Sequence, residues 1–411
     1  MATDAIILVG GGLAAGRLAS EYRAAGGEAE VTILSAEPDP PYNRPPLTKG
    51  FLRKEQDRDS TFVRPDAEYE DDVVELRLET TVEAIHPAEH EVELAAGERV
   101  PYGTLVLATG ARPRNLSIPG ADLVGVHTYR TLADAEVVSA AADEAHSAIV
   151  IGGSFVGSET AASLRTRGLG VTLVEMGDTL MPQLRCADLS AQLVDLYRVE
   201  GVDVRLQTHV EELTGNGRLL TGARTADGET IEGYLAIVGI GVVPNVELAA
   251  EAGADVDDGI VVDERFRTSL PDVYAIGDVA RYPDATAGRR RRIEHWSNAD
   301  AHGAHLGRQL AGSRAAYDTL PVFFTELFGR KLQVLGDVER ATECVLRGSL
   351  AGGRLIGFHL DDERRLVGAV IHGQAADVAV ELEELLRRGV VIDDPTRLLD
   401  GNLRPADAVV A

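Results

Sequence analysis

The fold is decided by the stretch Ile6-Ile7-Leu8-Val9-Gly10-Gly11-Gly12-Leu13-Ala14-Ala15, because its pattern returns as Ile149-Val150-Ile151-Gly152-Gly153-Ser154-Phe155-Val156-Gly157. Each copy predicts a buried β-branched strand, a glycine turn and a helix rich in small residues. A second strand follows each copy, at residues 31–35 and 171–174. The chain is therefore expected to contain two βαβ units, which indicate an α/β fold with parallel sheets.

The first copy has the pattern of a dinucleotide-binding turn. A pyrophosphate is bound by backbone N–H groups at a helix N-terminus, and glycine allows it to approach closely. An acidic residue about twenty positions further on accepts hydrogen bonds from ribose hydroxyls. The residues that we assign to this site are Gly10, Gly12, Leu13, Ala14, Ala15 and Glu37.

The second copy departs from the pattern at one position, because Ser154 replaces the middle glycine. A glycine-rich turn that only packs helices is the alternative interpretation. A carboxylate at Glu175 would bind a ribose 2′-hydroxyl and repel a 2′-phosphate, and residues 176–181 contain no arginine, so NADH is favoured over NADPH. The residues assigned to this site are Gly152, Ser154, Phe155, Val156, Gly157, Glu159, Glu175 and Gly241.

Two different dinucleotides in one chain indicate a redox relay. A nicotinamide gives up a hydride, which carries two electrons, whereas a flavin can pass electrons on singly. We therefore expect FAD at the first site and NADH at the second.

Three domains are expected from the order of strands and helices. Alternating residues at 73–100 predict antiparallel strands inserted into the first βαβ unit. From about residue 320 the pattern changes to strands at 331–335, 343–350, 354–360 and 366–372 and a helix at 375–388. The expected domains are a FAD-binding domain at 1–112 and 244–318, an NADH-binding domain at 113–243 and a C-terminal α+β domain at 319–411.

Composition and charge restrict the function further. The 411 residues include 66 acidic and 40 basic side chains, so a net charge of −26 disfavours nucleic-acid binding. Cys186 and Cys344 make neither a disulfide framework nor a CxxC motif, and each is interpreted as buried packing in a reducing compartment. Neither a membrane segment nor metal-ligand spacing is evident, His295, His302 and His305 included. A cytoplasmic protein is expected.

A family resemblance rests on six motifs spread between residue 6 and about residue 300. The chain resembles the FAD-dependent pyridine nucleotide oxidoreductases of glutathione-reductase fold, and within them the NADH-dependent ferredoxin and rubredoxin reductases and apoptosis-inducing factor. The motifs are Gly10–Ala15, Arg44-Pro45-Pro46-Leu47-Thr48-Lys49, Ala108-Thr109-Gly110, Gly152–Glu159, Thr268–Asp278 and Glu294-His295-Trp296.

The resemblance implies further residues of the flavin site. Asp278 is expected to bind the ribityl chain, and Trp296 to lie near the flavin where the electron acceptor docks. A helix cap at Asp278, a surface arginine at position 130 and a core tryptophan at position 296 are the alternatives. The remaining flavin-site residues are Arg44, Lys49, Val82, Ala108, Arg130 and His295.

Lys49 and Glu159 are the expected catalytic pair. The family places this lysine beside the flavin, where its charge would favour the reduced ring, and a buried ammonium group needs a partner such as Glu159. A salt bridge without a kinetic role is the alternative. Residues 41–50 contain no cysteine, which disfavours reduction of disulfides or peroxides through a cysteine pair.

The electron acceptor is expected to be a small iron–sulfur protein of an oxygenase or P450 system. The run Arg289–Arg292 would attract an acidic ferredoxin or rubredoxin, although a solvated loop is an equal alternative. Phe323-Phe324-Thr325-Glu326 replaces the Phe-Trp-Ser-Asp of related reductases, so the acceptor is less certain. Rubredoxin, quinone and monodehydroascorbate reductases remain alternatives, as does a redox-responsive interaction protein. A monomer or a homodimer is expected.

Overall fold

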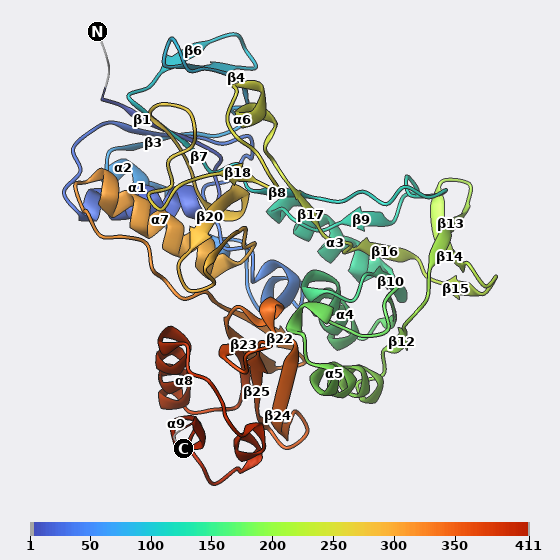
Figure 1. The fold of residues 1–411 in the computed structure, drawn as a ribbon. Helices are drawn as coiled ribbons and strands as arrows, with labels where there is room; N and C mark the ends of the chain where they lie inside the picture. The colour runs from blue at the N-terminus through green and yellow to red at the C-terminus, as the bar shows by residue number, and fades with distance from the viewer. Residues whose placement is uncertain (1–3, 410–411) are drawn as a thin grey trace. The chain divides into compact units, whose positions relative to one another are not determined.

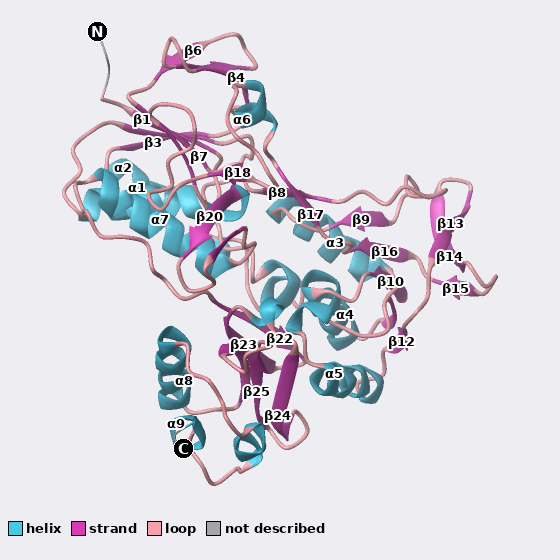
Figure 2. Ribbon diagram, viewed as in Figure 1, coloured by secondary structure: helices cyan, strands magenta, loops and turns pink. Residues whose placement is uncertain are grey.

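The computed structural model describes residues 4–409 and divides into two compact units. The first unit contains residues 4–43, 57–112 and 242–319, and the second contains residues 44–56, 113–241 and 320–409. Figure 1 labels the helices and strands, and Figure 2 distinguishes them by colour.

The first unit is built on a parallel sheet of five strands. The strands lie in the order β19 (Val273–Ala275), β7 (Thr104–Leu107), β1 (Ile6–Val9), β2 (Val31–Leu34) and β3 (Val74–Arg77). All four residues of β1 are buried, and β1 pairs in parallel with both β2 and β7. Crossover connections of this kind bring the carboxyl ends of the strands to one edge of the sheet, where ligands bind.

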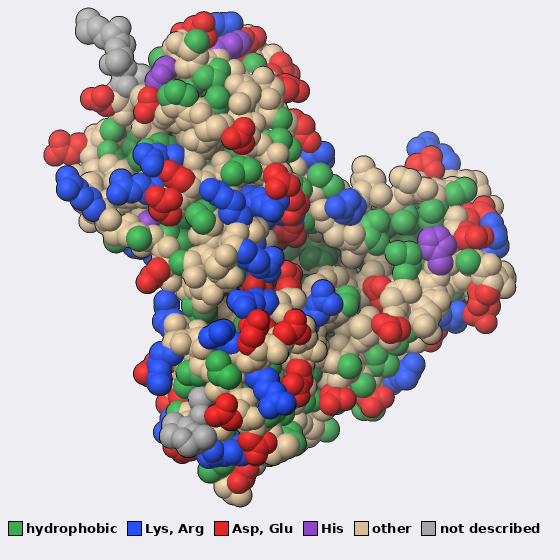
Figure 3. All heavy atoms as spheres, in the orientation of Figure 1, with side chains coloured by type: hydrophobic (Ala, Val, Ile, Leu, Met, Phe, Trp, Pro, Cys, Tyr) green, Lys and Arg blue, Asp and Glu red, His purple; other side chains and the backbone are tan. Residues whose placement is uncertain are grey.

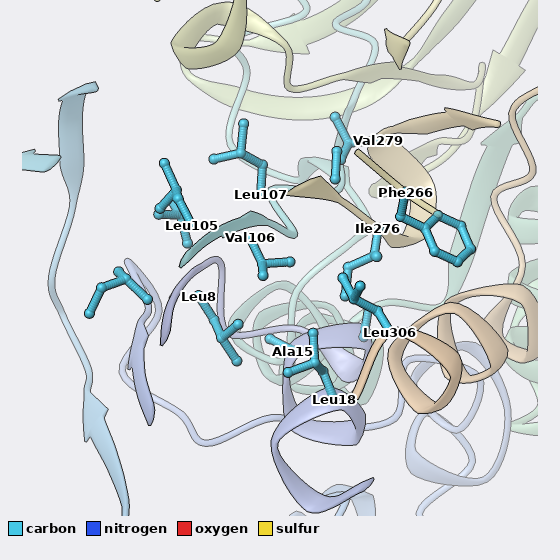
Figure 4. Close-up of a cluster of buried hydrophobic side chains, with 14 of the residues drawn as sticks. Leu8, Ala15, Leu18, Leu105, Val106, Leu107, Phe266, Ile276, Val279 and Leu306 are labelled. Atoms are coloured by element: carbon cyan, nitrogen blue, oxygen red, sulfur yellow. The ribbon is translucent and has the colours of Figure 1, made fainter. Parts of the chain in front are cut away.

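Two helices cover one face of this sheet. Helix α1 (Leu13–Ala24) follows the first glycine turn, and α7 (Trp296–Leu310) lies beside it (Figure 1). Their backbones come close together because α7 carries Gly303 and Gly307, where a Cβ atom would overlap the backbone of α1. Leu18, Val106, Ile276 and Leu306 meet in the core between the sheet and these helices (Figure 4).

Smaller elements complete the first unit. An antiparallel sheet contains β4 (Val82–His86), β5 (Glu91–Leu94) and β6 (Arg99–Pro101), and a third sheet contains β18 (Ile260–Val261), β20 (Ala280–Asp284) and β21 (Arg289–Arg291). Antiparallel strands were expected for all of residues 73–100, but β3 pairs in parallel with β2. Its side chains alternate because β3 is the last strand of its sheet, where one face is only partly buried.

The second unit contains another parallel sheet of five strands. The strands lie in the order β12 (Asp203–Arg205), β11 (Gly170–Val174), β10 (Ser147–Ile151), β16 (Leu235–Val238) and β9 (Val126–Thr128). Helices α3 (Leu132–Glu144), α4 (Phe155–Thr166) and α5 (Ala187–Val199) belong to this half of the unit. Strands β13 (Val210–Asn216), β14 (Leu219–Thr225) and β15 (Thr230–Glu232) form an antiparallel sheet beyond it.

Residues 320–409 of the second unit form an antiparallel sheet with helices. The strands lie in the order β22 (Val322–Leu327), β23 (Arg330–Gly336), β26 (Leu366–His372), β25 (Arg354–Leu360) and β24 (Glu343–Ser349). Helix α8 (Ala376–Arg388) packs on this sheet through Leu382, Leu385 and Leu386, and α9 (Pro405–Val409) follows. The sequence predicted four of these strands and α8, whereas β22 was not predicted.

Candidate functional site

The first glycine turn forms a cradle that only glycine fits. Gly10 has φ of +112°, and a Cβ atom there would overlap the carbonyl oxygen of Ala108. The next residue, Gly11, has Ser35 in the space that a side chain would fill. Helix α1 begins at Leu13, so its first backbone N–H groups face the end of β1. The geometry suits a pyrophosphate, and Ala14 and Ala15 are buried in the helix packing below it.

Glu37 lies just beyond the second strand of this unit, where the fingerprint requires an acid. Its carboxylate accepts a hydrogen bond from the Tyr42 hydroxyl over 2.5 Å, and its backbone N–H donates to Ser35 Oγ over 3.2 Å. These contacts fix the carboxylate at the carboxyl edge of the sheet. Tyr42 was not predicted, because the sequence gives no sign that its hydroxyl faces Glu37.

Asp278 is positioned by a turn that packs against α1 and α7. It belongs to the short helical segment Gly277–Val279, and Gly277 has φ of +72° with Ala14 next to it. The backbone N–H of Gly277 donates to His302 Nδ1 over 3.2 Å. Burial lowers the pKa of His302 to about 3, so the ring is neutral and can accept this bond. From the sequence, His302 was not expected to be a metal ligand and was interpreted as a satisfied or exposed histidine.

His295 and Trp296 lie at the start of α7. Burial lowers the pKa of His295 to about 4 although the charge of Asp278 acts in the opposite direction, which places the two side chains in electrostatic contact. Trp296 is 39% exposed, and its indole N–H donates to Asn43 Oδ1 over 2.7 Å. Trp296 is therefore a surface residue with a fixed ring rather than a core tryptophan.

The second glycine turn repeats the cradle in the other unit. Gly152 has φ of +107°, and a Cβ atom on it would overlap the carbonyl oxygen of Gly239. A Cβ atom on Gly157 would overlap the carbonyl oxygen of Gly152, so the first turn of α4 packs directly on the strand end. Ser154 is tolerated because its hydroxyl points to Gln183 and accepts a hydrogen bond from the amide Nε2 of that residue.

Glu175 is held at the end of β11 by two backbone amides. Its Oε2 accepts from Gly153 N over 2.6 Å, and its Oε1 accepts from Gly177 N over 2.7 Å. The carboxylate is thus fixed against the glycine turn, which is where a ribose of the bound dinucleotide would lie. Arg205, at the end of the neighbouring strand, is engaged by Asp203 and Glu229.

Lys49 and Glu159 form a buried ion pair within the second unit. Lys49 Nζ lies 2.6 Å from Glu159 Oε2, and the two residues are 8% and 7% exposed. Lys49 lies at a kink within the helical segment Leu47–Phe51, where its own backbone is not helical, and Glu159 lies in α4. Their contact agrees with the sequence-based expectation, whereas their part in catalysis stays a prediction.

Two threonines complete the surroundings of the Glu159 carboxylate. Thr48 Oγ1 donates to Glu159 Oε2 over 2.5 Å, and Thr325 Oγ1 donates to Glu159 Oε1 over 2.7 Å. Ser163 Oγ, on the same helix as Glu159, donates to the carbonyl oxygen of Thr48 over 2.7 Å. Both carboxylate oxygens therefore have donors, which a buried charge requires. The sequence analysis did not find these residues, because nothing in their spacing links them.

Arg44 and Arg130 belong to segments that meet in the second unit. The Tyr129 hydroxyl donates to the carbonyl oxygen of Leu47 over 2.6 Å, which joins the segment of Arg130 to that of Arg44 and Lys49. Arg130 precedes the capping box of α3, in which Thr131 and Asp134 exchange hydrogen bonds. Val82 is buried in β4 of the first unit, and Gly241 in the second unit has φ of +98°.

Comparison with known proteins decides the family. The sequence profile described as "Pyridine nucleotide-disulphide oxidoreductase" matches residues 4–303. The chain belongs to this family. A relative from Sphingobium, the ferredoxin reductase subunit of 5,5′-dehydrodivanillate O-demethylase, is 39% identical over 98% of this chain and 96% of its own.

Solved structures of this family agree over nearly the whole chain. The ferredoxin reductase for the CYP199A2 system of Rhodopseudomonas palustris has a TM-score of 0.93 and 32% identity, and the alignment covers 99% of this chain and 100% of that one. The covalent putidaredoxin reductase–putidaredoxin complex has a TM-score of 0.92 and 30% identity, with coverage of 98% and 97%. The expected glutathione-reductase-like fold and the oxidoreductase class are confirmed.

Membership in this family implies FAD and NADH or NADPH as cofactors. The residues present fit both groups. In each glycine turn, the first glycine, Gly10 or Gly152, packs so closely on a backbone carbonyl oxygen that a side chain there would overlap it. Each cradle also opens onto the first turn of a helix of 12 residues.

The arginine run is only partly available to a partner. Arg291 pairs with Asp284 over 2.6 Å, and Arg292 pairs with Asp258 and Glu294. Arg289 and Arg290 are exposed on β21, and Arg290 donates to the carbonyl oxygen of Val262. Figure 3 shows acidic and basic side chains intermixed on the visible face of the molecule.

The two cysteines are bonded to each other, in contrast to the separate packing roles favoured by the sequence. Cys186 and Cys344 form a disulfide within the second unit, with Cα atoms 5.3 Å apart. Their separation of 158 residues explains why the sequence did not indicate the pair. Residues 4–409 contain no group of three or more His, Cys, Asp or Glu side chains that could hold a metal ion. Within the same residues, no helix is both long and apolar enough to cross a membrane.

Proposed function

We propose that this chain is an NADH-dependent FAD enzyme that reduces a ferredoxin-type iron–sulfur protein. The observation that carries the proposal is the buried Lys49–Glu159 pair, whose lysine lies in the segment where disulfide reductases of this fold carry their cysteines. Residues 41–50 contain no sulfur, so electrons have no cysteine relay at this place. The Sphingobium relative and the Rhodopseudomonas structure are both named ferredoxin reductases.

Each domain has a separate task in this proposal. Residues 1–112 and 244–318 bind FAD, residues 113–243 bind NADH, and residues 319–411 form the C-terminal domain. FAD, when bound, supplies a ring that accepts hydride and releases single electrons. The glycine turns at residues 10–15 and 152–157 hold the two pyrophosphates, and Asp278 binds a further group of the flavin nucleotide.

Lys49 supplies a fixed positive charge in a site from which water is excluded. Burial makes such a charge more effective than it would be in water, and the geometry set by Glu159 removes the need for reorganisation during the reaction. Glu159 orients the ammonium group, while Thr48 and Thr325 fix the carboxylate. The pair thus acts as a preorganised electrostatic element rather than as a simple salt bridge.

Preference for NADH rests on Glu175. Two backbone amides bind its oxygens and hold the carboxylate at the end of β11. A 2′-phosphate there would meet like charge, whereas a 2′-hydroxyl would donate a hydrogen bond. Arg205 does not offset this charge, because Asp203 and Glu229 pair with it.

The ferredoxin docks near Arg289 and Arg290 in this proposal. Both side chains are exposed on β21, and Arg290 also donates to the carbonyl oxygen of Val262. Arg291 pairs with Asp284, and Arg292 pairs with Asp258. Local positive charge on a chain of net charge −26 would attract the acidic surface that ferredoxins present. Trp296, with its exposed and fixed ring, lies four residues beyond Arg292 in the chain and marks the same region.

The proposed function is tested by steady-state assays of the FAD-loaded protein. NADH and NADPH are each combined with [2Fe–2S] ferredoxins, rubredoxin and a quinone, and reduction of cytochrome c by the ferredoxin is followed. We expect turnover with NADH and at least one ferredoxin. Equal or higher kcat/KM with a quinone, or activity only with NADPH, would refute the proposal.

A further inference from the structure

The loop between β11 and α5 connects the second glycine turn to the C-terminal sheet. At its near end, Met181 N donates to the carbonyl oxygen of Gly153 over 2.8 Å, and Gln183 Nε2 donates to Ser154 Oγ. Among the described residues, no group donates to Gln183 Oε1 although this atom is buried. The loop therefore forms one wall of the nucleotide cradle.

The far end of this loop is held by residues 320–409. Cys186, the last residue before α5, is bonded to Cys344 on β24. Leu184 O accepts a hydrogen bond from His359 Nε2 over 2.6 Å, and His359 lies directly opposite Cys344 in the β24–β25 ladder. One covalent anchor and one hydrogen bond thus meet at the same place.

The loop needs these anchors because its backbone is in an unfavourable conformation. Met181 and Arg185 have φ of +50° and +47°, a region that residues other than glycine rarely adopt. Such residues persist only where surrounding contacts hold them. Loss of the covalent anchor at Cys186 would therefore let Met181 and Gln183 leave their positions. Their hydrogen bonds to Gly153 and Ser154 would then be weakened.

We propose that Cys186–Cys344 is a thiol–disulfide exchange site that takes a dithiol as reductant, and that its state sets the affinity of the cradle at residues 152–157 for pyridine nucleotide. This inference rests on the proposed function only in taking that nucleotide to be NADH. The pair lies outside the Pro41–Gly50 segment and takes no part in electron flow from NADH to FAD.

The two sulfur atoms have different roles in the exchange. Cys186 is 3% exposed, whereas Cys344 is partly exposed, so the incoming thiolate attacks the Cys344 sulfur. The Cys186 sulfur leaves as a thiolate at the N-terminus of α5, a helix of 13 residues whose dipole stabilises it. The second thiol of the reductant then attacks the reductant's own sulfur in the mixed disulfide and releases Cys344 as a thiolate. Two electrons and two protons reach the cysteines, and the reductant leaves as its disulfide.

The expected consequence is a change in nucleotide affinity without a change in the limiting rate. Among the described hydrogen bonds and covalent bonds that join the far end of the loop to residues 320–409, the reduced loop keeps the His359–Leu184 hydrogen bond. With the covalent bond lost, we expect the Met181–Gly153 and Gln183–Ser154 contacts to form less often. Lys49 and Glu159 make no contact with this loop among their described hydrogen bonds. Reduction should therefore raise the dissociation constant of NADH and leave the rate of flavin reduction at saturating NADH unchanged.

The test compares air-oxidised and dithiothreitol-treated holoenzyme. Iodoacetamide labelling and mass spectrometry count the thiols, calorimetry measures NAD⁺ binding, and anaerobic stopped-flow gives the dissociation constant of NADH and the limiting rate. We expect no labelled thiol before reduction and two after it. The dissociation constants should rise about fivefold or more on reduction.

Cys186→Ser and Cys344→Ser provide the matched variants. Both should show the reduced-state affinity with and without dithiothreitol. Two labelled thiols in the air-oxidised protein, or equal affinities in the two states of the wild type, would overturn the proposal, as would a dithiothreitol effect that persists in both variants. If a variant does not fold, the two states of the wild type decide. A holoenzyme that NADH reduces in neither state contradicts the proposed function, whereas reduction with equal affinity in both contradicts only the exchange site.

Discussion

Thr325 Oγ1 donates a hydrogen bond to Glu159 Oε1 over 2.7 Å, across 166 residues of sequence. Thr325 is fully buried on β22 of the C-terminal sheet, and Glu159 lies in α4 beside the second glycine turn. The other carboxylate oxygen binds Lys49. The C-terminal sheet therefore helps to fix the ion pair that we propose assists hydride transfer.

Replacing Thr325 should disturb catalysis through Glu159 alone. Thr325→Val keeps the shape of the side chain but leaves Glu159 Oε1 without this donor, which costs about 1.5–3 kcal/mol for a charged acceptor. We expect the limiting rate of flavin reduction by NADH to fall about tenfold, equivalent to about 1.4 kcal/mol of barrier. Stopped-flow absorbance measures this rate.

Thr325→Ser is the matched control because it keeps the hydroxyl. Its limiting rate should stay near that of the wild type, while Thr325→Val should also show a shifted pH profile for flavin reduction. Equal rates and equal pH profiles for the two variants would show that the hydroxyl only packs.

Lys49 itself should have a larger effect. Lys49→Ala removes the fixed charge and leaves Glu159 buried without its cation, so we expect hydride transfer to slow by about one hundredfold or more. Single-turnover mixing with saturating NADH separates this effect from binding. Lys54→Ala is the control, because Lys54 belongs to the same segment but pairs with Asp143 at the surface. A Lys49→Ala enzyme as fast as Lys54→Ala would leave the pair with a structural role only.

Glu175 should determine the choice between NADH and NADPH. Two like charges about 4 Å apart repel by about 1 kcal/mol in water and about 4 kcal/mol near a protein surface. In Glu175→Ala we therefore expect the ratio of kcat/KM for NADH to that for NADPH to fall about tenfold or more. Asp178→Ala removes the same charge from an exposed site of this loop and should leave the ratio unchanged. A ratio that moves equally in both variants would argue against specific recognition by Glu175.

The exposed arginines should affect ferredoxin more than a small acceptor. Replacing Arg289 and Arg290 with serine should lower kcat/KM for ferredoxin about tenfold at low salt, and the difference should shrink as salt screens the charges. Turnover with ferricyanide should change less. Arg314→Ser removes an exposed arginine outside the run and is the control. A parallel fall with both acceptors would remove the docking role.

The buried histidines should make the fold sensitive to acid. The pKa of His302 falls from 6.5 to about 3 because the ring is buried, so the unfolded chain takes up the proton first as the pH drops. The contribution of neutral His302 to the free energy of unfolding is therefore fully present above pH 6.5. As the pH falls from 6.5 toward 3, this contribution decreases by about 1.4 kcal/mol for each pH unit.

His302→Phe separates this effect from the hydrogen bond to Gly277. The variant should be less stable than the wild type at about pH 7.5, by about 1–3 kcal/mol, because Gly277 N loses its acceptor. Between about pH 7.5 and about pH 5 it should lose about 2 kcal/mol less stability than the wild type does. Urea unfolding followed by flavin fluorescence measures both, with exposed His146→Gln as the control. Parallel losses in wild type and His302→Phe would contradict the assignment.

The local patterns of the chain predicted most of the architecture. Strand β1, the glycine turns and the parallel pairing follow from residues that are close in sequence, because the βαβ unit is a local structure. Strands β25 and β26 were predicted with the bounds that the structure has. The strand β22 was missed because Phe323 and Phe324 are adjacent apolar residues and break the alternation typical of an antiparallel strand.

Contacts between distant residues could not be predicted in the same way. Glu37, Glu175 and the Lys49–Glu159 pair were identified from motif positions. Thr325 on Glu159 and Cys186 on Cys344 depend on how the C-terminal sheet packs within the second unit, and no periodicity in the sequence encodes that packing. The polar groups that surround a site are therefore found from the structure, after the sequence has located the site.

The central claim is that NADH reduces FAD in this chain and that a ferredoxin receives the electrons without a cysteine step. The most direct measurement takes the FAD-loaded protein, reduces it with dithiothreitol, alkylates both cysteines with iodoacetamide and removes the reagents. This protein is mixed with saturating NADH under anaerobic conditions and then with oxidised [2Fe–2S] ferredoxin. We predict that the flavin absorbance bleaches at the rate of the untreated protein and returns as the ferredoxin spectrum bleaches. A flavin that NADH leaves oxidised, or bleaching that alkylation abolishes, would contradict the account.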